Sequence, residues 1–170
     1  MAEVVLGIGG NSGDRLQNIM LAGALINDRL GKIITYSDII QSEPWGFESE
    51  NSFLNQVIVL NTEANPHQVL KVCQGIEDHM GRERTSSYSD RSMDIDILFY
   101  DDQVISDDQL IIPHPRLHRR LFVLMPLASI CPELKHPVLG STINELLDSC
   151  DDDSETRWFK GSYSFPVFPF

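Results

Sequence analysis

The stretch RSMDIDIL, residues 91–98, alternates polar and apolar side chains. In an extended chain its apolar residues point to one side, and the carboxylates of Asp94 and Asp96 point to the other. This alternation predicts a β-strand with one buried face. The other face then carries two carboxylates about 7 Å apart, a distance at which like charges repel each other. The pair therefore raises the question of which cations lie beside it.

The segments before this strand predict a βαββαβ order. Apolar patterns indicate strands at 3–10, 32–41, 52–61 and 91–100, and helices at 14–30 and 65–81. Gly31 ends the first helix, while Asn65 and Pro66 form a typical start for the second. This order is that of an α+β, ferredoxin-like fold, in which helices pack on an antiparallel sheet.

The remaining chain adds short elements to this core. Short strands are predicted at 104–105 and 110–112, a turn at 113–120, and helices at 121–130 and 141–150. Two polar segments, 42–51 and 82–90, are predicted to be loops. We expect residues 1–150 to form a single catalytic domain. Residues 151–170 form a C-terminal extension, an acidic connector followed by an aromatic tail, to which the sequence assigns no role.

Composition excludes several classes of protein. A net charge of −12 disfavours nonspecific binding to nucleic acids and to anionic membranes. There is no apolar run long enough to span a bilayer, and the N-terminus lacks the features of a signal peptide. The three cysteines are widely spaced and form no CxxC motif, which argues against a zinc site or a disulfide framework. We therefore expect a cytoplasmic protein.

The positive charges are concentrated near the two aspartates. Six of the 13 basic residues lie between positions 82 and 120, and all six are arginine, which suits forked contacts with phosphate. Mg²⁺ prefers carboxylate oxygens and usually keeps water and phosphate as its other ligands. The pattern thus predicts a site for a metal–triphosphate. Two simpler interpretations stay open: the aspartates mark a solvated strand face, and the arginines balance local acids.

Other polar residues allow both a structural and a functional interpretation. Asn55 lies inside the apolar run FLNQVIVL, where an amide destabilises the fold unless it is hydrogen-bonded, and its amide could also pair with a donor–acceptor edge of a ligand. Gln56 points to the opposite face and is expected to be solvated. His114 could be a turn residue, Phe122 a core residue, and Glu77 an ordinary acid of a helix surface.

Seven motifs taken together resemble the 6-hydroxymethyl-7,8-dihydropterin pyrophosphokinase family. They are GIGGN (7–11), SEPWG (42–46), FLNQV (53–57), IEDHMGRER (76–84), DRSMDIDIL (90–98), IPHPRLHRRLFVLMPL (112–127) and PE (132–133). The resemblance covers about residues 4–148, in order and with matching spacing. It implies transfer of the pyrophosphoryl group of ATP to the hydroxymethyl group of the pterin, giving AMP, as a step of folate biosynthesis.

The resemblance also implies roles for individual residues. Two Mg²⁺ ions would be held by Asp94 and Asp96. Catalytic roles would fall to Arg82, Arg91, Asp94 and Asp96. ATP, the cosubstrate, would contact Leu70, Gln74, Glu77, Arg84, Arg91, Ile97, His114 and Arg120. The pterin would contact Gly9, Ser42, Pro44, Trp45, Phe53, Asn55 and Phe122. Tyr88 would belong to a lid that closes over the phosphates.

The sequence departs from the family pattern at several positions. Gly10 replaces a common serine, Phe53 a frequent tyrosine, and Trp45 a smaller aliphatic residue. Tyr88 stands where tryptophan is frequent, and Ser89-Asp90 follows it where the family has Gly-Pro. The loop 82–90 is therefore expected to close with different packing.

Two alternatives to this function remain. The carboxylate pair also occurs in metal-dependent nucleotide phosphohydrolases and nucleotidyltransferases, although the latter have a Gly-Gly or Gly-Ser turn shortly before the pair, and here Gly9-Gly10 lies far upstream. A non-enzymatic ferredoxin-like binding module is the second alternative. The expected partners are ATP and the hydroxymethyl pterin, with no nucleic acid and no membrane, and we expect a monomer.

Overall fold

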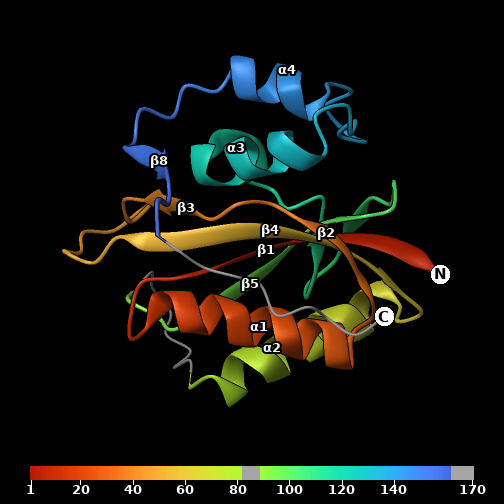
Figure 1. Cartoon of the computed structure of the whole chain (residues 1–170). Helices are drawn as coiled ribbons and strands as arrows, with labels where there is room; N and C mark the ends of the chain where they lie inside the picture. The colour runs from red at the N-terminus through yellow and green to blue at the C-terminus, as the bar shows by residue number, and fades with distance from the viewer. Residues whose placement is uncertain (82–88, 162–170) are drawn as a thin grey trace.

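A six-stranded antiparallel sheet lies between two layers of helices (Figure 1). The computed structural model describes residues 1–81 and 89–161. Its strands are β1 (Ala2–Gly10), β2 (Ile33–Tyr36), β3 (Ile40–Ser42), β4 (Phe53–Thr62), β5 (Asp94–Tyr100), β6 (Ile105–Ser106), β7 (Ile111–Ile112) and β8 (Thr156–Trp158). Its α-helices are α1 (Arg15–Arg29), α2 (Pro66–His79), α3 (Leu121–Ile130) and α4 (Ile143–Asp148).

The ferredoxin-like core is confirmed. The strand order is β5-β1-β4-β3-β8, with β2 also paired to β4, and every pairing is antiparallel. Strands β1 and β3 thus flank β4, and β4 and β5 flank β1, which is the double split-βαβ arrangement. Helix α1 is capped by Asp14, and α2 by a reciprocal pair of hydrogen bonds between Asn65 and Gln68.

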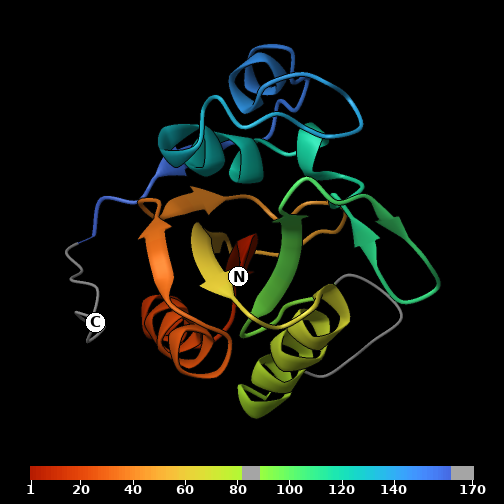
Figure 2. The same ribbon diagram turned by 90° about the vertical axis from the view of Figure 1, so that its right-hand side faces the viewer.

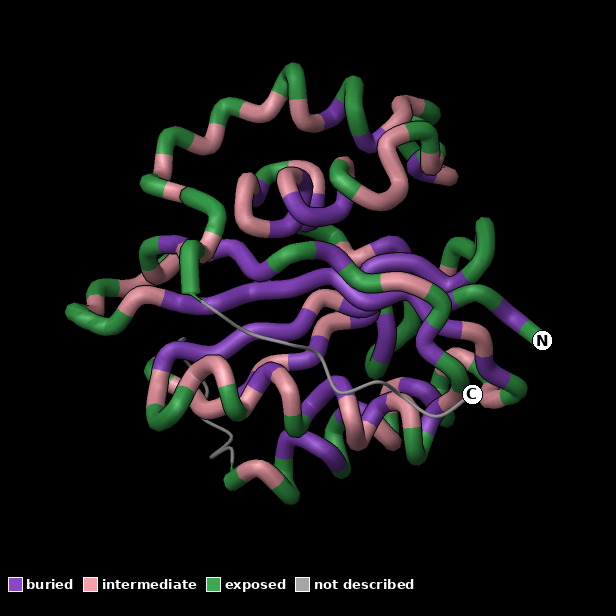
Figure 3. The backbone as a smooth tube through the Cα atoms, in the orientation of Figure 1, coloured by how far each residue is buried: buried purple, intermediate pink, exposed green. Residues whose placement is uncertain are grey.

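Helices cover both faces of the sheet. Helices α1 and α2 pack on one face, and α3 and α4 form a separate layer on the other (Figure 2). Strand β4 is buried along nearly its whole length (Figure 3), because Leu54, Ile58 and Leu60 enter the first core while Val57 and Val59 enter the second. The central strands therefore join two hydrophobic cores.

Two predicted strands have different bounds in the structure. The predicted strand 32–41 is divided into β2 and β3, because the Ser37 hydroxyl accepts the Val57 N–H at 3.0 Å and the Gln56 amide donates to the Ser37 carbonyl at 2.7 Å. Strand β3 continues to Ser42, which was expected in a loop. The predicted strand 91–100 begins only at Asp94, since backbone N–H groups of Asn11 and Ser12 bind the Arg91 carbonyl.

Part of the C-terminal extension completes the sheet. Strand β8 pairs with β3, with Thr156 opposite Ser42, and this strand was not predicted from the sequence. Across the described residues, none of the helices combines the length and apolarity that crossing a bilayer requires.

Candidate active site

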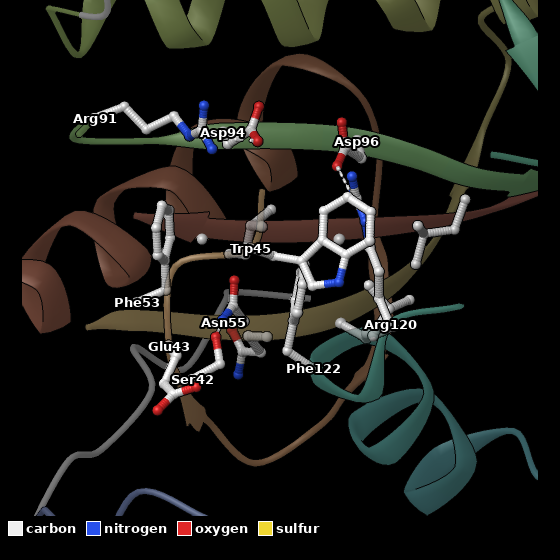
Figure 4. Close-up of a pocket in the computed structure, with 17 residues that line it drawn as sticks. Ser42, Glu43, Trp45, Phe53, Asn55, Arg91, Asp94, Asp96, Arg120 and Phe122 are labelled. Carbon is white, nitrogen blue, oxygen red and sulfur yellow. Dashed lines mark hydrogen bonds and ion pairs between the residues drawn. The ribbon is translucent and has the colours of Figure 1, made fainter. Parts of the chain in front are cut away.

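A cavity that is partly open to solvent lies between the sheet and the start of α3. Alternate residues of β1, β4 and β5 form its floor, and the segment that follows β3 supplies one wall (Figure 4). The floor belongs to the sheet face that α3 and α4 cover further along. Glycines 7 and 9 of β1 lie at its centre, opposite Asp96 and Asp94, so the middle of the floor has no side chains.

The two aspartates share one face of β5, as the alternation predicts, and that face opens into the cavity. Their side chains are 28% and 34% exposed. The Nε of Arg91 lies 3.6 Å from Asp94 Oδ2, and Nη1 of Arg120 lies 4.0 Å from Asp96 Oδ2 (Figure 4). Each carboxylate therefore has an arginine beside it, and the pair does not simply mark a solvated surface.

His114 faces the same carboxylate as Arg120. Its Nε2 lies 3.8 Å from Asp96 Oδ2, and its Nδ1 accepts the Arg116 N–H at 3.2 Å. Burial, reinforced by the positive charge of Arg120, lowers the pKa of His114 to about 4. The ring is therefore neutral at pH 7, and because Nδ1 accepts a hydrogen bond, its proton is on Nε2.

Aromatic rings lie beside both arginines, and of these Trp45, Phe53 and Phe122 line the cavity. The Arg120 guanidinium lies 4.5 Å from the Trp45 ring centre and 5.6 Å from that of Phe122. The Arg91 guanidinium lies 5.3 Å from the ring centre of Phe53 and 5.9 Å from that of Phe47. Such cation–π contacts hold each guanidinium on a ring face. Phe47 was not predicted, although its position one residue after the SEPWG motif could have suggested it.

A buried amide lies on the cavity floor. Asn55 is 8% exposed, and its Nδ2 donates to the Ser42 hydroxyl at 2.8 Å, which satisfies the requirement that the sequence raised. Gly9 is required beneath it, because a Cβ there would lie 2.2 Å from Asn55 Oδ1. The expectation that Gln56 is solvated is wrong: it is 1% exposed, contributes to the cavity lining, and its amide donates to the Ser37 carbonyl.

The structure does not bring all predicted site residues into this cavity. Leu70 and Gln74 line a separate surface cavity beside Gln109. Ile97 is buried in the core under α1 and α2, on the sheet face opposite to Asp96. Pro44 does not line the cavity, although its neighbours Glu43 and Trp45 do. Arg82, Arg84 and Tyr88 lie outside the described residues.

Glu77 has a structural contact that the sequence did not predict. It is 4% exposed, and its carboxylate accepts the Ile95 N–H at 2.8 Å, so it is not an ordinary acid of the helix surface. Through this bond α2 holds the backbone of β5 between the two aspartates.

Comparison with known proteins places this chain in a family. The model of the family described as 7,8-dihydro-6-hydroxymethylpterin-pyrophosphokinase (HPPK) matches residues 5–132. The chain belongs to this family. It is therefore a pyrophosphokinase, an enzyme of the transferase class, and a further relative, from Schizosaccharomyces pombe, is named a folic acid synthesis protein.

Two relatives of this pyrophosphokinase match over most of their length. The 2-amino-4-hydroxy-6-hydroxymethyldihydropteridine pyrophosphokinase of Porphyromonas gingivalis is 40% identical over 141 residues, which cover 81% of this chain and 95% of the relative. The enzyme of the same name from Methylorubrum extorquens is 37% identical over 162 residues, covering 92% of this chain and 99% of the relative.

A solved structure supports the fold of the pyrophosphokinase domain. A crystal structure of wild-type HPPK-DHPS from Plasmodium falciparum superposes with a TM-score of 0.71 at 21% identity, covering 86% of this chain and 44% of the other. This chain thus spans less than half the length of that solved protein, and the likeness concerns the fold alone.

Proposed function

We propose that this protein transfers the pyrophosphoryl group of ATP to the hydroxymethyl group of 6-hydroxymethyl-7,8-dihydropterin within the cavity of Figure 4, giving AMP and the pterin diphosphate. One observation carries the proposal. Two carboxylates, each beside an arginine, and a buried amide among aromatic rings line the same cavity. The first group suits a metal-bound polyphosphate and the second suits a flat heterocycle.

The pterin would bind at the end of the cavity that holds Asn55. The amide of Asn55 can exchange hydrogen bonds with the donor–acceptor edge of the ring, and Ser42 fixes the orientation of that amide. Phe53, Trp45 and Phe122 would stack on the ring. Since Arg120 now contacts two of these aromatic faces, a stacked pterin would compete with its guanidinium and release it toward the phosphates.

Asp94 and Asp96 fit a site for Mg²⁺. They offer carboxylate oxygens on one rigid strand, and both side chains are accessible from the cavity. No group of three potential metal-binding side chains occurs among the described residues, so the other ligands would be water and phosphate oxygens, as is usual for Mg²⁺. Two bound ions would lower the pKa of the pterin hydroxyl and offset phosphate charge.

The protein's own side chains would act by orienting the substrates and by stabilising charge on the phosphates. Arg91 and Arg120 would contact the phosphates and stabilise charge that develops during transfer. The Nε2–H of neutral His114 would donate to a phosphate oxygen. Leu70 and Gln74 line a separate surface cavity, so they would contact only a part of the nucleotide that extends beyond the cavity of Figure 4. We expect no covalent intermediate, because aligning the attacking hydroxyl oxygen with the leaving phosphate oxygen is sufficient for this chemistry. We also expect the protein to act as a monomer in the cytoplasm.

Product analysis tests this function. Incubation with ATP, Mg²⁺ and the hydroxymethyl pterin should give AMP and the pterin diphosphate in equal amounts. A phosphohydrolase would instead give ADP or inorganic phosphate without pterin product, a nucleotidyltransferase would give a nucleotidylated product, and a binding module would give none of these.

Asp96→Asn tests the role of the carboxylate pair. We expect kcat to fall by about a thousandfold or more, because the variant keeps the shape of the side chain but loses a metal-binding charge. Calorimetry with a non-hydrolysable ATP analogue and Mg²⁺ should show weaker binding, while the melting temperature stays near that of the wild type. Asp28→Asn, at the far end of α1, is the matched control. Wild-type turnover in Asp96→Asn would refute the assignment.

A further inference from the structure

Three segments of the chain meet at one edge of the cavity, next to Arg91. The first follows β1 and contains Asn11, which is 3% exposed. The second is the loop between β3 and β4, which carries Trp45 and Phe47 in its first half and Ser49 and Asn51 in its second. The third is the short stretch that leads into β5. Side-chain hydrogen bonds between residues outside the strands and helices join them.

The carboxylate of Asp90 is the centre of this junction. Its Oδ1 accepts a hydrogen bond from Asn11 Nδ2 at 2.7 Å, and its Oδ2 accepts one from Asn51 Nδ2 at 2.9 Å. Together with the Ser49 hydroxyl, which makes the largest contribution, these donors lower the pKa of Asp90, so the carboxylate is ionised at pH 7. Asn11 Nδ2 also donates to the Asn51 carbonyl at 3.1 Å. One carboxylate thus links the first two segments to the third.

The residue held by this junction is Arg91. Its carbonyl accepts the N–H groups of Asn11 and Ser12 at 2.9 and 3.2 Å, and its own N–H donates to Asn11 Oδ1 at 2.9 Å. With its backbone fixed on both sides, Arg91 directs its guanidinium to Asp94 and to the ring of Phe53 (Figure 4). The guanidinium also lies against the ring of Phe47. Phe47 comes from the same loop as Asn51, so the loop and the arginine are positioned together.

We propose that Asp90 is a positioning residue that ties the β3–β4 loop to the segment after β1. It thereby holds Arg91 and the aromatic rings of this loop, Trp45 and Phe47, in the arrangement required for pyrophosphoryl transfer. The inference rests on the proposed function for its kinetic consequences.

Asp90→Ala tests the proposal. We expect kcat to fall about tenfold, because a small displacement of a group that acts on the phosphates has a large effect on the rate. The melting temperature should change little, since Asp90 is exposed and outside both cores. Hydrogen exchange should become faster at the amides of Asn11, Ser12 and Arg91, and remain unchanged at Ile95, which is held by Glu77. Asp28→Ala is the control and should match the wild type in all three measurements.

A double-mutant cycle with Asn51→Ala separates positioning from a loss of local structure. If Asp90 acts through Asn51, the double variant should lose no more activity than Asp90→Ala alone. Additive losses, or wild-type kcat and exchange rates in Asp90→Ala, would overturn the proposal. The exchange measurement does not depend on turnover. The wild type could make no pterin diphosphate while Asp90→Ala still exchanged faster at the amides of Asn11, Ser12 and Arg91. That result would refute the proposed function but support the junction.

Discussion

At the scale of single residues, the cavity depends on two glycines with different surroundings. Both lie on β1 and both face the cavity, opposite Asp96 in the case of Gly7 and opposite Asp94 in the case of Gly9. A Cβ on Gly9 would overlap the Asn55 side chain, whereas a Cβ on Gly7 would make an ordinary contact with Leu98 at 3.5 Å. Replacing each glycine by alanine therefore tests whether the cavity needs glycine only where Asn55 lies against it, at Gly9, or at both positions.

We expect Gly9→Ala to weaken pterin binding at least tenfold, because the added methyl group displaces the amide that would read the ring edge. Gly7→Ala should weaken binding much less. Isothermal titration with the hydroxymethyl pterin, in the presence of Mg²⁺ and a non-hydrolysable ATP analogue, measures both. Equal losses in the two variants would contradict the placement of Asn55 in the pterin site.

The sequence predicts where side chains lie, though not what they do, when a local pattern carries the information. Period-two alternation places Asp94 and Asp96 on one face, and a polar amide in an apolar run marks Asn55 as hydrogen-bonded. Gln56 and Phe47 were not identified, because their surroundings come from segments distant in sequence: Gln56 binds the Ser37 carbonyl, and Phe47 lies against Arg91. No pattern in a single sequence records such contacts.

At the scale of elements, β8 joins both walls of the cavity. It pairs with β3 beside Ser42, and the Asp152 carboxylate that precedes it accepts the N–H of Leu121, the first residue of α3, at 2.9 Å. Burial acts to raise the pKa of Asp152, but hydrogen bonds from Ser154 and Leu121 outweigh it and hold the pKa below its usual value. Asp152 thus caps a helix whose own N-cap residue, Arg120, makes no capping hydrogen bond with its side chain.

Truncation after Cys150 should therefore affect the pterin site. We expect the KM for the pterin to rise several-fold and stability to fall by about 2 kcal/mol, since a helix cap and the pairing of an edge strand are lost together. Truncation after Gly161 keeps every β8 contact described above and is the control. Steady-state kinetics and urea unfolding measure the two effects. A full-activity protein that ends at Cys150 would show that β8 does not support the cavity.

Element boundaries were predicted less well than element types, and the reason lies in nonlocal hydrogen bonds. The run KIITYSDIIQ reads as one strand, yet Ser37 and Gln56 interrupt it by bonding across to β4. Strand β8 was not predicted because its three residues show no alternation of their own. They form a strand by pairing with the edge of β3. Helix caps such as Asn65 were predictable because their partners lie within four residues.

At the scale of the whole molecule, the sheet is shared by two cores. The near-continuous apolar run of β4 is typical of a strand covered on both faces, but no residue in it indicates which helices cover each side. In the structure, Leu60 packs in the core under α1 and α2, and the adjacent Val59 packs in the core under α3 and α4. If either helical layer detached from the sheet, one apolar face of β4 would be exposed to water.

We therefore expect the protein to unfold in a single cooperative transition. Leu60→Ala should lower the unfolding free energy by about 3 kcal/mol, and Val59→Ala by somewhat less, because each leaves a cavity in a different core. Each variant should show a single transition, shifted to lower urea. Its midpoint should be the same by far-UV circular dichroism and by the fluorescence of Trp45 and Trp158. Ile34→Ala, at a position 50% exposed on β2, should change it little. Two separated transitions in Val59→Ala, with the α1–α2 layer persisting after α3 and α4 unfold, would show that the cores are energetically independent.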